Sequence, residues 1–241
     1  MVTSMEENQD ITHHIYQQFN EELIDLHNQV LSMGGLVEEQ VANAIIALTT
    51  KDDVLAKRVY TNDYKVNALE VAIDEECTRI IARRQPAASD LRFIMSMIKA
   101  INDLERIGDE AERIAHMSLQ VEGEVKSRYF IAINHLGDHV RQMLHDALDA
   151  FARFDIEAGL AVMHEAEKVD DEYEGISRQL LTYMMEDTRS IPTVLSILWS
   201  ARALERISAH ARNLCEYMIY FVKGKDVRHI SLKEIDQKAH Q

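Results

Sequence analysis

The sequence predicts an all-α protein formed by tandem duplication of an antiparallel three-helix bundle. Two observations support this: helix-breaking residues are rare, and one phrase occurs twice. The 241 residues include 8 glycines and 2 prolines, and aromatic residues make up 6% of the chain, which favours long helices over strands. LERIGDEAERIA at 104–115 returns as LERISAHARNLC at 204–215. A repeat of about one hundred residues is longer than a solenoid unit and fits a small helical bundle.

The first copy begins with two helices separated by a capping segment. One helix is expected from about Thr12 to Leu48, and Gly34 and Gly35 mark a point where it could bend. TTKDD at 49–53 supplies N-cap residues for the second helix. Apolar residues on that helix recur at spacings of three, four and their sums, which predicts one buried face. They are Val59, Val66, Leu69, Ile73 and Ile80.

The third helix follows a clear break in the pattern. RRQPAASD at 83–90 contains Pro86, which ends the second helix, and Ser89 or Asp90 is expected to cap the third. An apolar stripe then alternates spacings of three and four residues, which is the spacing of a bundle seam. It consists of Ile94, Met97, Ile101, Leu104, Gly108, Ala111 and Ala115.

The second copy repeats this order of elements from about Tyr129 onward. Leu136–Phe151 matches the apolar pattern of Met33–Leu48 at an offset of 103 residues, and after the next turn the offset falls to 100. We therefore assign residues 1–122 to the first three-helix bundle and residues 123–241 to the second. We expect the two antiparallel bundles to be placed end to end.

The overall charge and the cysteine content restrict the function classes. The formal net charge of −15 argues against a nucleic-acid-binding surface, which needs a basic stripe to displace counterions. The two cysteines, Cys77 and Cys215, form no Cys-x-x-Cys pair, which fits a reducing compartment. No apolar run has the length of a signal-peptide core or the roughly 20 residues of a membrane span. We expect a cytoplasmic protein with no nucleic-acid partner and no membrane insertion.

Two pairs of polar residues fall at matching heights of the second and third helices. Glu105 and Asp109 are four residues apart and share one helix face, as do Asp63 and Asn67. Asp63 and Asp109 lie 23 residues on either side of Pro86. Asn67 and Glu105 lie 19 residues on either side of it. An antiparallel hairpin that turns at this proline places the members of each pair at one level. Because a hard cation with oxygen ligands removes the repulsion between clustered carboxylates, these four residues are a candidate metal site.

The same spacing has a second interpretation that needs no metal. Exposed charges are the ordinary case on helices, so the acids could form a solvated face. The neutralising partners would then be three arginines of the same helices, Arg58, Arg106 and Arg113.

The second copy has lost half of the polar pattern. Ala166 and Ala209 stand where the first copy has its two facing aspartates, while Asp170 and Glu205 remain at the other level. Two facing positions differ together, as expected if the four positions form one site. Chance would produce the same pattern, and Glu165, Glu167 or His210 could compensate for the missing acids. We therefore predict that the second site binds a cation weakly or has lost it.

Several longer stretches of the sequence, taken together, are specific enough to indicate a family. They are RRQPAASDLR at 83–92, LERIGDEAERIA with its degenerate second copy, LTYMMEDTRSIP at 181–192 and YFVKGKDVRHI at 220–230. Together they resemble the PhoU family, the accessory proteins of bacterial phosphate-specific transport, over nearly the whole chain. The resemblance implies two similar three-helix bundles and metal ions held by Glu/Asp-x-x-x-Asp motifs. By position, the motif here is Glu105 and Asp109.

The resemblance also implies a regulator with no catalytic activity of its own. Family members repress the phosphate-starvation response when phosphate is plentiful, and they link the phosphate importer, through its ATPase subunit PstB, to the sensor kinase PhoR. A homodimer is expected. The metal is expected to be a divalent or trivalent ion, with iron, zinc, manganese and magnesium all open.

Two other function classes were weighed against this interpretation. A carboxylate-bridged di-metal oxidase or storage bundle of the ferritin-like kind needs Glu-x-x-His pairs, and the sequence contains none. A metal-independent helical adaptor or phosphotransfer module could use His116, which lies on the same stripe as Glu105 and Asp109. A histidine at such a position is more often a helix residue without special chemistry.

Overall fold

The computed structural model describes the backbone of residues 3–121, 128–228 and 230–239, and the side chains of residues 17–121, 130–228 and 230–235. Within these ranges the chain is helical and contains no strand, so the predicted all-α class is confirmed. The elements are α1 (Thr3–Thr50), α2 (Asp53–Asn62), α3 (Tyr64–Arg84), α4 (Ala88–Leu119), α5 (Arg128–Arg153), α6 (Ile156–Glu186), the short 3-10 helix η1 (Thr188–Ser190), α7 (Ile191–Lys223) and α8 (Leu232–Ala239). None of the helices in the described ranges combines the length and the apolar character needed to cross a membrane.

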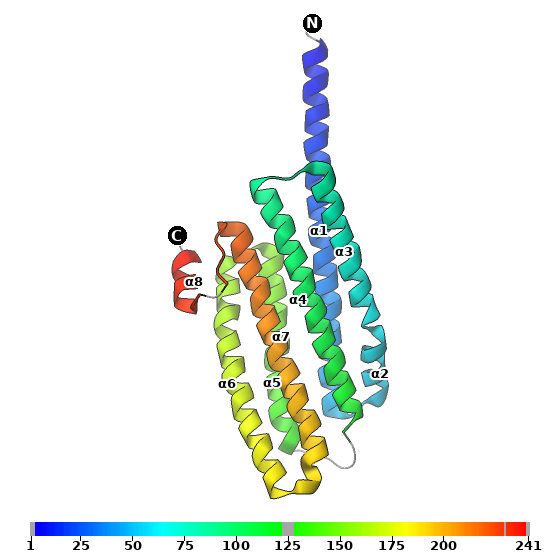
Figure 1. The fold of residues 1–241 in the computed structure, drawn as a ribbon, viewed down its shortest axis with the longest axis vertical. Coiled ribbons are helices and arrows are strands. Elements are labelled where there is room, and N and C mark those ends of the chain that lie inside the picture. The colour runs from blue at the N-terminus through cyan, green and yellow to red at the C-terminus, as the bar shows by residue number, and fades with distance from the viewer. Residues whose placement is uncertain (1–2, 122–127, 229, 240–241) are drawn as a thin grey trace.

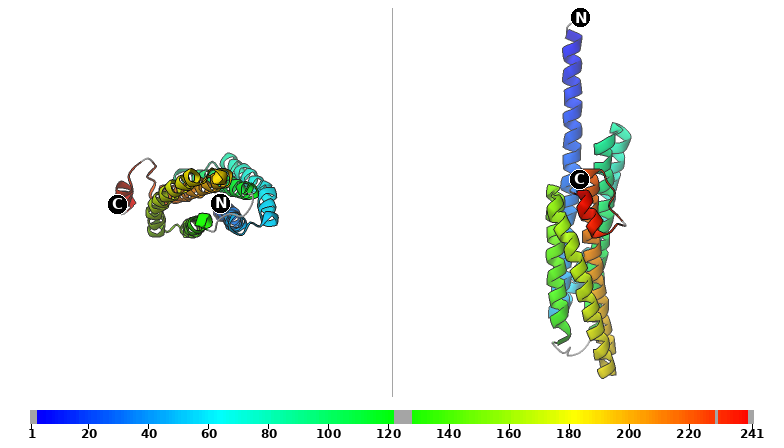
Figure 2. Two further views of the ribbon diagram at one scale, coloured as in Figure 1. Left: turned by 90° about the horizontal axis from the view of Figure 1, so that it is seen from below. Right: turned by 90° about the vertical axis from the view of Figure 1, so that its left-hand side faces the viewer.

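The two three-helix bundles lie side by side, with their long axes in the same direction (Figure 1). The first contains α1, α3 and α4 with the short α2, and the second contains α5, α6 and α7. Helices α4 and α7 run antiparallel at the centre, and α1 and α5 pack against one side of this pair (Figures 1 and 2). The expected end-to-end placement was therefore wrong. The boundary proposed between residues 122 and 123 lies outside the described residues.

A second buried stripe on α4 explains the side-by-side arrangement. The predicted seam of α4 is buried as expected, but so is a parallel stripe that faces α7. This stripe consists of Ser96, Ala100, Asp103, Ile107, Glu110 and Ile114. Its small residues allow close approach, and the Ser96 hydroxyl donates a hydrogen bond to the backbone carbonyl of Tyr217 at 3.3 Å. Because α4 is buried on two sides, the two bundles share one continuous core.

Two glycines at equivalent positions of the copies bring α1 and α5 together. A Cβ atom at Gly34 would lie 2.7 Å from Cδ2 of Leu148, and one at Gly137 would lie 2.8 Å from Cγ2 of Ile45. Gly34 and Ile45 of the first copy correspond to Gly137 and Leu148 of the second at the offset of 103 residues, so the two contacts are equivalent. Helix α1 continues through Gly34 without interruption, so this glycine serves close packing and the helix does not break there.

The helix expected between residues 53 and 84 is interrupted at Asp63. Its start agrees with the prediction, since the Asp52 side chain accepts a hydrogen bond from the backbone N–H of Leu55 at 2.9 Å. One residue, Asp63, then separates α2 from α3 although its backbone angles are helical. The prediction of a single helix was wrong here, because the apolar spacing carries across the interruption.

The predicted cap of α4 was also wrong. Helix α3 ends at Arg84, and its C-cap residue Gln85 adopts a left-handed conformation with φ 50°. Helix α4 begins at Ala88, before both proposed caps. Ala87 occupies the N-cap position and supplies no side-chain hydrogen bond. Asp90 instead lies in the first turn of α4, where its charge favours the positive end of the helix dipole.

Candidate metal centre

Three carboxylates converge between the α2–α3 junction and α4. Asp63 lies at the junction, while Asp109 and Glu112 lie three residues apart on one face of α4. One oxygen from each of the three carboxylates can be chosen so that all lie within 4.8 Å of one another. The structure thus brings Asp63 and Asp109 together at one level. An ion placed among these oxygens would contact ligands from two helices.

The other two predicted residues lie beside this group. The Asn67 amide donates a hydrogen bond from Nδ2 to Oδ2 of Asp63 at 3.1 Å, so it orients that carboxylate. Glu105 is half-buried one turn before Asp109 and acts on the group as a neighbouring charge. Glu112 was not predicted as a ligand, although its position three residues after Asp109 places it on the same helix face.

Buried polar atoms without partners surround Asp63. Oδ1 of Asp63 is buried and has no hydrogen-bond partner among the described residues, and the same is true of both amide atoms of Gln40 on α1. A Cβ atom at Gly108 would lie 3.2 Å from Oδ1 of Asp63 and 3.5 Å from Oε1 of Gln40. Buried polar groups are normally satisfied, so these oxygens call for a partner that the side chains do not provide. A hard cation fits this set of carboxylate and amide oxygens.

The charges of the group act against one another. Burial raises the pKa of Asp63, and the nearby charge of Asp109 raises it further. Burial likewise raises the pKa of Glu112, with additional contributions from Asp63 and Asp109. The pKa of Glu105 is raised by burial and by the charges of Asp109 and Glu70. A bound cation would favour the ionised form of every one of these groups.

Arginine neutralisation does not account for the cluster. Among the described side chains, no arginine forms an ion pair with Asp63, Asp109 or Glu112. Arg113 instead pairs with Glu110 at 3.4 Å. The charge of Arg106 lowers the pKa of Glu105, but burial and the neighbouring acids outweigh this effect. The arrangement therefore favours a cation-binding group over the solvated acidic face.

We expect the acidic group to reduce the stability of the metal-free protein as the pH rises from the ordinary carboxyl range towards neutrality. Because the pKa values of Asp63, Glu105 and Glu112 are raised, the folded chain holds protons that the unfolded chain has already released. These groups therefore lower the free energy of unfolding as the pH rises above about 4, where unfolded carboxyls titrate. Thermal unfolding of chelator-treated protein over a pH series measures the effect.

Other carboxyls contribute the opposite slope, since arginine partners lower the pKa values of Glu22 and Asp226. The test is therefore the difference between the wild-type chain and Asp63→Asn, which removes the most buried carboxyl of the group. The wild-type chain should lose more stability than the variant between acidic and neutral pH. An equal change of stability with pH in the two proteins would contradict the assignment of the effect to the acidic group.

The second copy replaces each member of the convergent group. Ala166 and Ala209 correspond to the two aspartates, and Arg212 stands where the first copy has Glu112. The buried surroundings change as well, because Ser208 and Met143 replace Gly108 and Gln40 and lie in contact at 3.3 Å. An arginine side chain thus supplies positive charge where the first copy gathers negative charge.

The remaining acids of the second copy lie near arginines. Glu205 pairs with Arg202 at 2.9 Å. Burial raises the pKa of Asp170, and the charges of Arg212 and Arg202 oppose that shift. Asp170 and Glu205 line one hollow together with Arg212, whose positive charge opposes the binding of a cation there. The loss or weakening of the second site stays a prediction, and Arg212 is a physical reason for it.

Known proteins resemble this chain along most of its length. The family model described as the PhoU domain matches it twice, at residues 30–117 and 133–218. The phosphate-specific transport system accessory protein PhoU of Serratia marcescens is 53% identical over 224 residues, which cover 93% of this chain and 92% of that protein. The protein of the same name from Escherichia coli K12 is 50% identical over 228 residues, 95% of each chain.

Solved structures share the fold. A crystal structure of PhoU from Pseudomonas aeruginosa superposes with a TM-score of 0.83 at 51% identity, covering 86% of this chain and 100% of that one. A crystal structure of the phosphate transport system regulatory protein PhoU from Streptococcus pneumoniae gives a TM-score of 0.81 at 31% identity, covering 87% of this chain and 99% of that one.

Proposed function

Because this chain belongs to the PhoU family, as the resemblance in its sequence predicted, we propose that it is a non-catalytic regulator of phosphate transport and phosphate signalling. It represses the phosphate-starvation response when phosphate is plentiful. The observation that carries this proposal is the whole-chain similarity to proteins named as accessory to phosphate-specific transport, at 50–53% identity over more than nine-tenths of their length.

The proposed partners are the PstB ATPase subunit of the phosphate importer and the sensor kinase PhoR. The chain acts in the cytoplasm as a homodimer and connects the two, so that the state of the importer reaches the kinase. The names of the relatives support a partnership with transport components. The net charge of −15 favours basic partner faces over acidic ones.

We also propose that the first copy binds a divalent or trivalent metal ion. Asp63, Asp109 and Glu112 supply the carboxylate oxygens, Asn67 orients Asp63, and Glu105 adds negative charge beside them. Oxygen ligands favour magnesium, manganese or iron, with zinc as a further candidate. The ion would tie the α2–α3 junction to α4 and remove the mutual repulsion of the three carboxylates. The second copy, with Asp170 and Glu205, binds weakly or not at all.

The enzyme alternative has less support. A ferritin-like oxidase builds its site from histidines and carboxylates in the interior of a four-helix bundle. Here the convergent group contains carboxylates alone and lies beside the seam of α4, with the Asp109 side chain exposed. The proposed role of the metal is structural support of a regulatory surface.

A binding experiment with both partners tests the linking role. The full chain is immobilised, and purified PstB and the cytoplasmic part of PhoR are passed over it singly and then together. We expect each to bind and both to be retained at once. The Escherichia coli PhoU protein, treated identically, is the control. Retention of both partners by the control and of neither by this chain would contradict the proposed link.

A further inference from the structure

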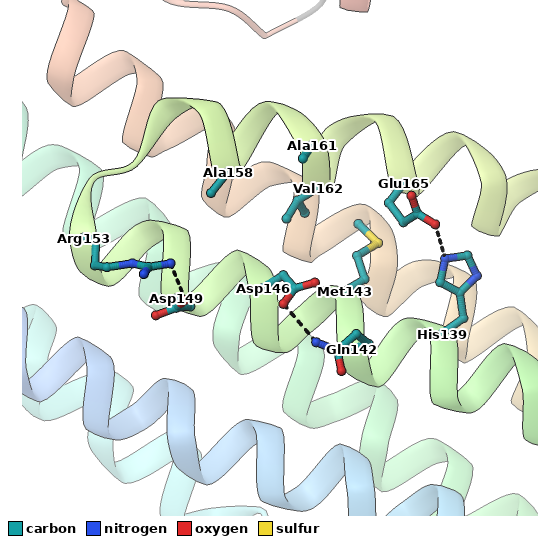
Figure 3. Close-up of a pocket in the computed structure, with 10 residues that line it drawn as sticks. All are labelled: His139, Gln142, Met143, Asp146, Asp149, Arg153, Ala158, Ala161, Val162 and Glu165. Carbon is teal, nitrogen blue, oxygen red and sulfur yellow. Dashed lines mark hydrogen bonds and ion pairs between the residues drawn. The ribbon is translucent and has the colours of Figure 1, made fainter.

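A chain of histidines and glutamates lies on the outer face of the second copy, away from the acidic cluster. His135 and His139 lie four residues apart on α5, and Glu165 and Glu172 lie on α6. Nδ1 of His135 lies 2.6 Å from one oxygen of Glu172, and Nδ1 of His139 lies 3.0 Å from the other. Nε2 of His139 lies 2.9 Å from Oε1 of Glu165. Figure 3 shows Glu165 and His139 meeting across the groove between α6 and α5.

The duplication provides an internal comparison for this group. At the offset of 103 residues, the first copy has Ser32, Leu36, Asn62 and Leu69 at the four equivalent positions. None of these is a carboxylate or an imidazole, and Leu36 and Leu69 pack against the core. The three-helix bundle therefore forms without ionisable residues there. All four positions carry metal-ligating residue types in the copy that has no acidic cluster.

Both ring nitrogens of His139 face carboxylate oxygens. Glu165 also accepts a hydrogen bond from Lys168 at 2.7 Å, so a positive charge lies beside this carboxylate. The ionised carboxylate only accepts, so Nε2 of His139 carries the hydrogen. In the neutral imidazole Nδ1 is then a lone pair that faces an oxygen of Glu172. Two acceptors 3.0 Å apart require a cation between them, either a proton or a metal ion.

The contact between His139 and Glu165 has the form found beside metal-bound histidines. A ligating histidine typically donates its second ring N–H to a carboxylate, which fixes the tautomer and the ring orientation. Glu165 has this position relative to His139. Two histidines four residues apart project from one helix face, as in helical zinc sites. The ligand atoms of His135, His139 and Glu172 do not all lie within 4.8 Å of one another in the structure. Binding an ion therefore requires a turn of the His135 side chain, which is 78% exposed.

We propose that His135, His139 and Glu172 form a binding site for a transition-metal ion of borderline softness, such as Zn²⁺, with Glu165 as the positioning residue for His139. Imidazole and carboxylate ligands together suit Zn²⁺, whereas hard ions such as Mg²⁺ prefer oxygen ligands alone. The site differs in ligands and location from the carboxylate centre of the first copy. It does not depend on the proposed regulatory function.

Calorimetric titration with Zn²⁺ tests the proposal. The full chain carries Asp109→Asn in every sample, so that the first-copy centre does not contribute. We expect one Zn²⁺ ion to bind this protein, and His139→Ala to weaken binding at least about tenfold. Glu165→Gln should weaken it by about tenfold as well, the usual effect of removing an orienting carboxylate. Binding should also weaken at acidic pH, because protons compete for the imidazoles.

His145→Ala is the matched control. His145 lies on the same helix and pairs with Glu38 at 2.9 Å, but it takes no part in the group. It should leave the Zn²⁺ affinity unchanged. Circular dichroism of each variant shows whether the helices are retained. If His135→Ala/His139→Ala takes up as much Zn²⁺ with the same affinity as its parent, the proposal is overturned.

Discussion

Replacement of Asp103 by alanine is expected to destabilise the protein by about 3–5 kcal/mol. Asp103 is 5% exposed at the α4–α7 contact. Its carboxylate accepts hydrogen bonds from His210 at 2.6 Å, Asn213 at 3.2 Å and the Tyr217 hydroxyl at 2.6 Å. The substitution leaves three donors of α7 without their acceptor in a largely buried position, and each bond to a charged group contributes roughly 1.5–3 kcal/mol.

The phenol of Tyr217 reflects the same environment, since burial and the hydrogen bond to Asp103 raise its pKa. Urea unfolding, followed by circular dichroism, measures the loss of stability. Asp138→Ala is the control, because Asp138 is 76% exposed and pairs loosely with Arg141 at 3.7 Å. The control should change stability by less than about 0.5 kcal/mol. Similar losses in the two variants would show that the contact does not hold the two bundles together.

Asp109→Asn is expected to abolish the stabilisation that a bound metal ion gives. An ion that binds only the folded chain, at one hundred times its dissociation constant, adds about 2.7 kcal/mol to the free energy of unfolding. For a chain of this size that corresponds to roughly 5–10 °C in Tm. The wild-type chain should show such a rise on addition of Mn²⁺, and the variant should show little of it.

The same variant should behave in the opposite way without metal. The charge of Asp109 raises the pKa of Asp63 and of Glu112, so its removal relieves repulsion in the metal-free protein. We therefore expect chelator-treated Asp109→Asn to be at least as stable as the wild-type chain. Asp170→Asn in the second copy is the matched control and should keep the full response to Mn²⁺. Loss of the response in Asp170→Asn, with Asp109→Asn unaffected, would place the ion in the second copy and contradict the assignment to the first.

The sequence allowed the helices and their seam to be predicted, because spacing and breaking residues are local signals. It did not allow the contact between the bundles to be predicted. The stripe of α4 that faces α7 includes Asp103 and Glu110, whose charges conceal its burial from an apolar pattern. Their partners, such as His210 and Arg206, come from the other copy about one hundred residues away.

The candidate site was predictable in part for a similar reason. Equal distance from Pro86 fixes the level of two residues in a hairpin but not the rotation of each helix. Asp63 and Asp109 do meet, whereas Asn67 turns to Asp63, and Glu112 completes the group. The helix interruption at Asp63 leaves no mark in the apolar spacing. The substitution of Arg212 for Glu112 was visible in the repeat, and it became informative only once Glu112 was placed in the cluster.

Alkaline phosphatase activity in cells grown with ample phosphate tests the central claim most directly. The measurement compares a strain that lacks this gene with the same strain carrying the gene on a plasmid, and with an empty-plasmid control. A regulator that represses the starvation response predicts high activity in the deletion strain and a return to low activity on restoration. Low activity in all three strains would contradict the proposed function while leaving the fold and the metal centre to be judged on their own tests.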